Sequence, residues 1–393
     1  MRSALSAFRA NDQGETAEPG TPCLPFSIGH SVPKSTACRL ANDWPVNSST
    51  GAGQRQRYNP AMPRYFLGLD VGGTKTHALV ADEIGRALGF GVGGPGNPQA
   101  VGYEGLTRAV VAAAHAALAA AGRSPDQIVG AGFGIAGFDW PSQRGTTLRA
   151  LDPLGLHAPL KIVNDTLVGL LAGAEQGWGV AVVAGTGCNC RGWDVNRREG
   201  RATGMGDWSG EAAGAYDVVV KALQAVSYEW TRRGPATRLT QAFVEMTGAR
   251  DTADLIEGLA ARRYRLDASA APLVFRVAAG GDPAAQAVIR WAGGELGGLA
   301  AGVIRQLNFE PLAFEVVLVG SLYDGGSILV EAMRETIQAV APAARLVRLT
   351  APPVVGGVLL GMEQAGMRPS ALRRALARST SELLNGTAAG VRD

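Results

Sequence analysis

Two turns rich in glycine and threonine carry the clearest chemical signal in the sequence. The first follows Asp70 and consists of Gly72, Gly73 and Thr74, with Lys75 directly after them. Glycine lets the backbone approach a phosphate chain and present N–H donors to it, and the threonine hydroxyl and lysine charge would add to this. Asp70 is placed to hold Mg²⁺ directly or through water. The turn lacks the Gly-Lys-Ser/Thr ending of a Walker A loop, and alone it is equally compatible with an ordinary hairpin.

A second turn of the same kind, Gly185, Thr186 and Gly187, follows another apolar strand about 115 residues further along. Two such turns can hold the β- and γ-phosphates of one nucleotide from opposite sides, which is the positioning that phosphoryl transfer requires. The repeat therefore predicts two related lobes that face each other across a central ATP and substrate cleft.

Asn164 and Asp165 follow the apolar pair Ile162 and Val163 and precede a predicted helix. An aspartate at this place could simply cap the helix. At the carboxyl end of a strand, between the two turns, it is also well placed as a general base that accepts the proton of a sugar hydroxyl. We favour Asp165 as the base.

Further polar residues on loops are candidates for ligand contacts. Asn97 and Asp139 follow strands of the first lobe and could bind sugar hydroxyls, although turn chemistry explains Asn97 equally well. Glu211 lies in a glycine-studded loop that opens a helix, where it would complement the helix dipole. Gly320 and Ser321 follow an apolar strand and could lie against adenine or ribose, or form a helix-entry turn.

The elements around these residues alternate between strands and helices, which predicts an α/β fold with two ribonuclease-H-like (actin/hexokinase-like) lobes. A mainly helical insertion over 214–306 is expected in the second lobe. The strands are predicted at Tyr65 to Val71, Thr76 to Ala81, Ala87 to Val92, Ile128 to Ile135, Leu160 to Val163, Val180 to Ala184, Phe314 to Val319 and Ala344 to Leu349.

Composition divides the chain and excludes several classes of function. Residues 1–61 are polar and aperiodic, so we expect a disordered or mis-annotated tail with Met62 as the natural start. The lobes are expected at 62–178 and 179–368, and a C-terminal tail at 369–393. A net charge of +3 without a basic run argues against nucleic acid, and no apolar stretch is long enough for a membrane span. Four cysteines make no disulfide framework, so a reducing cytoplasm is expected.

The residues named above resemble a known family. Asp70-x-Gly-Gly-Thr, Gly185-Thr186-Gly187-x-Asn189-Cys190 and the Gly210-Glu211 loop are similar to motifs of the BadF/BadG/BcrA/BcrD ATPase family, and within it of the N-acetylglucosamine kinases. The resemblance covers about Arg64 to Gly366. It implies a sugar kinase that uses ATP and Mg²⁺ and binds a small-molecule sugar, with no nucleic acid and no membrane; a homodimer stays open.

The resemblance also implies roles for single residues. Asp165 looks like the catalytic base, Asn97 like a sugar ligand, and Thr186 and Gly187 like residues that contact both phosphate and sugar. Glu211 replaces the usual Asp of a Gly-Asp-Glu-Gly string, and Asp207 is a rival for that acidic position. Ala136 replaces a serine often found near the sugar, which leaves glucosamine open beside N-acetylglucosamine. The substrate-binding residues that we expect are Asn97, Asp139, Asn164, Thr186, Gly187 and Glu211.

Two other functions share these turns. An ATPase that activates a reductive dehydratase would need cysteines for an iron–sulfur cluster between subunits, and here only Cys188 and Cys190 are suitably spaced. A sugar sensor without turnover would be expected to carry a DNA-binding helix-turn-helix, and the first 60 residues show no such pattern.

Overall fold

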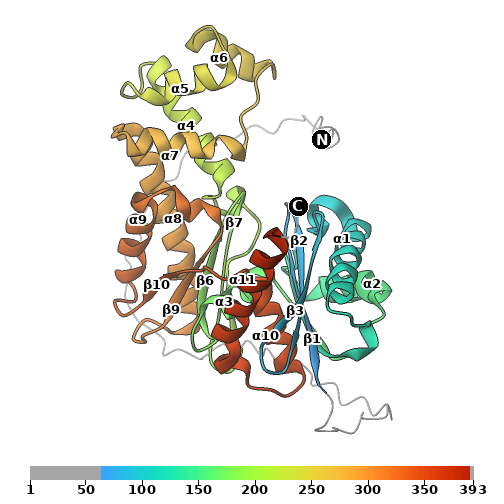
Figure 1. Cartoon of the computed structure of the whole chain (residues 1–393). Helices are drawn as coiled ribbons and strands as arrows, with labels where there is room; N and C mark the ends of the chain where they lie inside the picture. The colour runs from blue at the N-terminus through green and yellow to red at the C-terminus, as the bar shows by residue number, and fades with distance from the viewer. Residues whose placement is uncertain (1–62, 390–393) are drawn as a thin grey trace, which may run out of the picture. The chain divides into compact units, whose positions relative to one another are not determined.

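The computed structural model describes residues 63–389, so the predicted tail over 1–61 and the proposed start at Met62 lie outside the described residues. The described chain forms two five-stranded sheets with helices on their faces (Figure 1). Among its helices, none has the length and apolar character needed to cross a membrane.

The first sheet combines a hairpin meander with two parallel strands. Its order is β3-β2-β1-β4-β5, with β1, β2 and β3 antiparallel and β4 and β5 parallel to β1. The strands confirm the predicted ones to within one residue. They are β1 (Tyr65–Val71), β2 (Thr76–Asp82), β3 (Ala87–Gly93), β4 (Ile128–Ile135) and β5 (Leu160–Val163).

The second sheet repeats this arrangement. Its order is β10-β9-β6-β7-β8, in which β6, β7 and β8 form the antiparallel meander and β9 and β10 run parallel to β6. Two sheets with one topology confirm the duplication that the paired turns predict. The strands are β6 (Gly179–Ala184), β7 (Cys188–Trp193), β8 (Glu199–Arg201), β9 (Glu315–Val319) and β10 (Arg345–Arg348).

Two helices lie between the sheets, α3 (Asp165–Gly173) and α10 (Val354–Gln364) (Figure 1). One buried apolar cluster includes residues of both helices together with Phe66 of the first sheet and Val317 of the second. The helices approach each other closely, because a Cβ added at Gly356 would lie 1.8 Å from the carbonyl oxygen of Val168. The two sheets therefore share one core, and α3 is fixed from both sides.

The C-terminal part of the chain returns to the first sheet. A Cβ at Gly68 of β1 would lie 2.3 Å from the backbone nitrogen of Val358, so α10 packs directly on that sheet. The segment expected to be a tail from Pro369 instead forms α11 (Arg373–Ala389). Leu376 of this helix is fully buried, and the Ser379 hydroxyl accepts a hydrogen bond from the backbone N–H of Ala87 at 3.0 Å. The basic residues of this helix obscure its apolar positions in the sequence. These positions, such as Leu376, become buried only when the first sheet has folded.

Helices α1, α8 and α9 cover the outer faces of the sheets, and further helices extend from the second sheet. α1 packs on the first sheet through a second apolar cluster, and α8 and α9 pack on the second sheet through a third. The segment between β8 and β9 is helical in the structure, and Figure 1 shows α4 leading from the second sheet to α5 and α6. These helices are α1 (Pro98–Ala120), α2 (Arg144–Leu151), α4 (Ala215–Trp230), α5 (Arg238–Thr247), α6 (Thr252–Ala260), α7 (Ala271–Ala279), α8 (Pro283–Leu307) and α9 (Ser327–Gln338).

Candidate active site

Both glycine-rich turns are hairpin tips on the central strands of their sheets. The first tip closes with the Gly72 N–H donating to the Lys75 carbonyl at 2.9 Å, and the second with the Gly185 N–H donating to the Gly187 carbonyl at 2.9 Å. A Cβ added at Gly73 would meet open space, as it would at Gly185 and Gly187. The backbone of both tips is therefore accessible to a bound anion.

The second hairpin is held by the start of α4. The backbone N–H groups of Ala215 and Tyr216 donate to the carbonyls of Gly185 and Thr186, at 2.8 and 3.3 Å. A side chain at Gly214 would collide with the hairpin, because its Cβ would lie 2.4 Å from the Gly187 Cα. The position of this hairpin is thus tied to the position of α4.

Gly320 lies beside the same hairpin. Its φ of +109° is accessible to glycine, and its Cβ would lie 2.2 Å from the carbonyl oxygen of Ala184, directly before the turn. The next residue, Ser321, is exposed. The structure therefore brings together Gly320, Ser321 and the second turn, three of the predicted nucleotide contacts.

Asp70 and Asp165 form a pair of carboxyl groups between the sheets. The pKa of Asp70 is raised to about 7, first by burial and then by the negative charge of Asp165, with Lys75 opposing the rise. The pKa of Asp165 is raised to about 6, mainly by burial and also by the charge of Asp139, with Arg191 opposing the rise. Two carboxyl groups that interact in this way resist ionising together, so a cation bound near them would be favoured.

Asn164 and Asp165 both lie at the start of α3 and both accept a hydrogen bond there. Asn164 is the N-cap residue of α3, and its Oδ1 accepts the Thr166 N–H at 3.0 Å. Asp165 Oδ1 accepts the same N–H at 3.0 Å. Because Asn164 already caps the helix, Asp165 occupies the first helical position, where the dipole favours its charged form.

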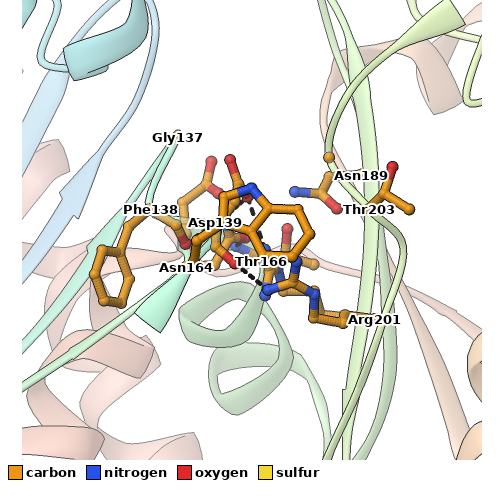
Figure 2. Close-up of polar contacts among 12 residues, drawn as sticks. Gly137, Phe138, Asp139, Asn164, Thr166, Asn189, Arg201 and Thr203 are labelled. Carbon is orange, nitrogen blue, oxygen red and sulfur yellow. Dashed lines mark hydrogen bonds and ion pairs between the residues drawn. The ribbon is translucent and has the colours of Figure 1, made fainter. Parts of the chain in front are cut away.

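Asp139 is the centre of a buried polar network (Figure 2). Its Oδ1 accepts from Arg191 Nη2 at 2.7 Å and from Asn164 Nδ2 at 3.2 Å, and its Oδ2 accepts from Gln99 Nε2 at 3.0 Å. Arg201 Nη1 donates to the Asp139 carbonyl. The predicted sugar ligand Asp139 therefore has three side-chain donors of its own, and it holds Asn164 in place.

Two functional candidates on the second sheet were missed in the sequence. Arg191 on β7 reaches across to Asp139 and also pairs with Glu199 of β8. Asn189 on the same strand has its Oδ1 on the Cys190 N–H at 2.8 Å, and Figure 2 shows its side chain directed toward the group around Asp139. Asn189 and Arg191 are two residues apart on the strand that follows the second turn, so their side chains lie on the same face of the sheet. This spacing is the signal that could have identified them.

Asn97 caps α1 as its N-cap residue, with Oδ1 accepting the Gln99 N–H at 2.9 Å. It also lies against the Asp139 loop, since a Cβ at Gly137 would come within 2.3 Å of Asn97 Oδ1. The local backbone hydrogen bond that the sequence left open as an alternative is thus formed. It places Asn97 beside Gln99 and the polar network.

Glu211 and Asp207 have different surroundings. The Glu211 carboxylate accepts backbone N–H groups from Thr203, Gly204 and Met205, the last two at 2.7 and 3.1 Å. Asp207 is exposed. The backbone N–H groups directly before α4 donate to Asp217 in the first turn of that helix, whereas the Glu211 carboxylate is held by the preceding loop.

The described cysteines are poor candidates for metal ligands. Burial raises the pKa of Cys188 to about 12 and that of the fully buried Cys190 still higher, so both thiols stay protonated at neutral pH. Between residues 63 and 389 no three His, Cys, Asp or Glu side chains are grouped so that they could hold a metal ion. A cation here would rely on one or two carboxylates together with substrate oxygens, as Mg²⁺ commonly does.

A model of the BadF/BadG/BcrA/BcrD ATPase family matches residues 67–361, which span both sheets. The chain is similar to the N-acetylmuramic acid/N-acetylglucosamine kinase of Clostridium acetobutylicum, with 23% identity over 307 residues, 77% of this chain and 99% of that protein. It is also similar to the N-acetyl-D-glucosamine kinase of Dictyostelium discoideum, with 26% identity over 311 residues, 76% and 97% of the two chains.

A crystal structure from Chromobacterium violaceum, provisionally named an N-acetylglucosamine kinase, superposes with a TM-score of 0.58 and 25% identity. The superposition covers 76% of this chain and 98% of the Chromobacterium violaceum chain.

Proposed function

Because the chain belongs to the BadF/BadG/BcrA/BcrD ATPase family, we propose that it is an ATP-dependent kinase that phosphorylates a hydroxyl of an amino sugar. N-acetylglucosamine is the first candidate substrate, followed by glucosamine and N-acetylmuramic acid. The observation that carries the proposal is the place of Asp165, at the start of α3 between Asp70 of the first sheet and Arg191 of the second.

In this proposal the chain's two hairpins bind the phosphates of ATP. The N–H groups of residues 73–75 and of Thr186 and Gly187 face the anion, because those of Gly72 and Gly185 close the turns, and Gly320 with Ser321 lies beside the adenosine. Asp70 would hold Mg²⁺, whose part is to neutralise charge on the transferred phosphate. The raised pKa of Asp70 fits this role, because a buried carboxyl beside another is stabilised as an anion by a cation.

Asp165 would remove the proton from the attacking sugar hydroxyl. A pKa of about 6 leaves it mostly ionised at neutral pH while making it a stronger base than an ordinary aspartate. The proton moves to a carboxylate oxygen of Asp165 as the sugar oxygen bonds to the γ-phosphorus and the bond to ADP breaks.

The sugar would lie among the predicted polar residues. Asn97, Asn164, Thr186 and Gly187 remain direct ligands in the proposal, and Asn189 joins them. Asp139 and Glu211 are given supporting parts, because their carboxylates already accept hydrogen bonds from the chain itself. A cytoplasmic location remains part of this proposal.

An ADP-release assay with a panel of sugars tests the proposal. We expect ADP formation that depends on N-acetylglucosamine or a close amino sugar, with less from glucose, and loss of turnover when EDTA removes Mg²⁺. ADP formation that no sugar stimulates would contradict the kinase assignment.

A further inference from the structure

A cavity of about 310 Å³ lies between α4 and the start of α8, away from the hairpins. Its walls are mostly apolar, and its volume is at the lower end of the range for small-molecule sites. The residues of α4 in its lining recur at helical spacing, so they share one face of that helix. The lining consists of Lys221, Gln224, Ala225, Tyr228, Pro235, Pro283, Ala284, Ala287 and Val288.

The charge of this cavity is positive. Among its lining residues in the described chain, Lys221 carries a charge and none carries a carboxylate. The Lys221 Nζ lies 5.0 Å from the ring centre of Trp291, and the Arg233 guanidinium lies 4.6 Å from the ring centre of Tyr228. A second cation is thus stacked on the cavity wall.

The carboxylates nearby are used elsewhere. Asp282, at the N-cap of α8, accepts hydrogen bonds from Thr237 Oγ1, from the Arg238 N–H and from the Ala285 N–H. Glu229 accepts a hydrogen bond from Thr240 Oγ1. These acids accept hydrogen bonds from the chain itself, and the lining contains Lys221 without a carboxylate.

We propose that this cavity binds a small amphipathic organic anion, with an aromatic or short aliphatic body against the alanine and proline walls and an acid group on Lys221. A neutral apolar molecule would fill the walls but leave the ammonium unpaired. A simple inorganic anion would pair with Lys221 but gain nothing from the walls. The combination of both features selects the class of ligand.

The site is connected to the catalytic region through α4. This helix lines the cavity with Lys221 and Tyr228, and its first N–H groups hold the carbonyls of Gly185 and Thr186 in the second hairpin. A ligand that moves α4 would also move that hairpin, so the anion is expected to change the apparent affinity for ATP. This coupling rests on the proposed function, whereas binding of the anion does not.

Fluorescence titration of the full chain with 1-anilinonaphthalene-8-sulfonate tests the binding, with displacement by 4-phenylbutyrate. We expect one saturable site and at least fivefold weaker displacement by the neutral 4-phenylbutan-1-ol. Lys221→Met should weaken 4-phenylbutyrate at least fivefold, and Ala287→Phe, which fills the exposed side of the cavity, should abolish binding. Arg290→Met, an exposed charge on α8 outside the lining, should stay within twofold.

Unchanged affinity in both Lys221→Met and Ala287→Phe, with native circular dichroism, would overturn the site. The site would also be overturned if sedimentation showed a dimer that binds no probe and that the Ala287→Phe change dissociates. The coupling is read separately as at least a twofold change in KM for ATP with saturating 4-phenylbutyrate, lost in Ala287→Phe. If no sugar is phosphorylated, the proposed function fails while the titration still decides whether the anion site exists.

Discussion

The Arg191 Nη2 atom lies 2.7 Å from Asp139 Oδ1, and this ion pair joins the second sheet to the first. The two side chains are 3% and 4% exposed, so the charges are shielded from water. Arg191 also pairs with Glu199 and stabilises the charged form of Asp165. The Arg191 guanidinium thus connects strand β7, which follows the second glycine-rich turn, with the Asp139 loop that holds Asn164.

Arg191→Met should strongly destabilise the protein, because it leaves the carboxylate of Asp139 buried without its cation. Removing one partner of a buried pair costs about 3–5 kcal/mol. Thermal unfolding measures this effect, and the double variant with Asp139→Asn should recover part of the loss. Arg108→Met is the control, since Arg108 and Glu104 are 73% and 95% exposed, and it should change stability by less than ~0.5 kcal/mol. Equal losses of stability in Arg191→Met and Arg108→Met would contradict the role of Arg191 in a stabilising buried ion pair.

The pH dependence of turnover should report the raised pKa of Asp165. The base works only when ionised, so kcat/KM for the sugar, which follows ionisation of the enzyme before the sugar binds, should fall as pH drops through about 6 and reach half its value near that pH. A carboxyl with an ordinary pKa would leave kcat/KM nearly unchanged down to about pH 5 and halve it only near pH 4. A profile of kcat/KM for the sugar separates the two, and a flat profile between pH 7 and pH 5 would contradict the assignment.

Glu211→Ala should disrupt the loop beside the polar network. Its carboxylate holds the N–H groups of 203–205, and a Cβ at Gly204 would come within 2.9 Å of Asp139 Oδ1, so this loop touches the network directly. Losing charge-assisted hydrogen bonds worth about 2 kcal/mol should lower kcat/KM for the sugar roughly 30-fold. Asp207→Ala, in the same loop but exposed, should stay within about threefold. The reverse order would make Asp207 the important acid.

Gly356→Ala should lower both stability and turnover. The added methyl carbon would lie 1.8 Å from the Val168 carbonyl oxygen, so α10 and α3 must separate and Asp165 moves with α3. Such overpacking costs about 1–3 kcal/mol. Gly294→Ala on α8, where nothing lies within 4 Å, is the matched control and should be neutral or stabilising by up to ~1 kcal/mol. Unfolding curves that coincide for the two variants would show that this contact is unimportant.

The sequence predicts the sheets well because strand alternation and glycine turns are local signals. The strand Tyr65–Val71 and the turns at residues 72–75 and 185–187 appear as expected. The repeated topology follows from recognising those turns as copies. Asn97, Asp139 and Gly320 were chosen as candidates by a similar local signal, because each lies within four residues of the end of a strand, whereas Glu211 does not.

Contacts between distant parts of the chain could not be predicted in this way. The partner of Arg191 lies 52 residues earlier, on the loop after β4 of the first sheet, and the sequence around Arg191 does not indicate which distant residue it contacts. The packing of α10 on β1 depends on glycines in both elements, and the burial of Leu376 requires the folded first sheet. The many polar residues of α11 led to the prediction of a tail at this end of the chain.

Asp165→Asn is the most direct test of the central claim, that one carboxylate between the two hairpins is the base for phosphoryl transfer. The change keeps the shape of the side chain and removes its ability to accept the proton. We predict a fall in kcat of at least 100-fold in the ADP-release assay, while equilibrium binding of ATP stays within about threefold of the native protein. Native turnover in the folded variant would contradict the account.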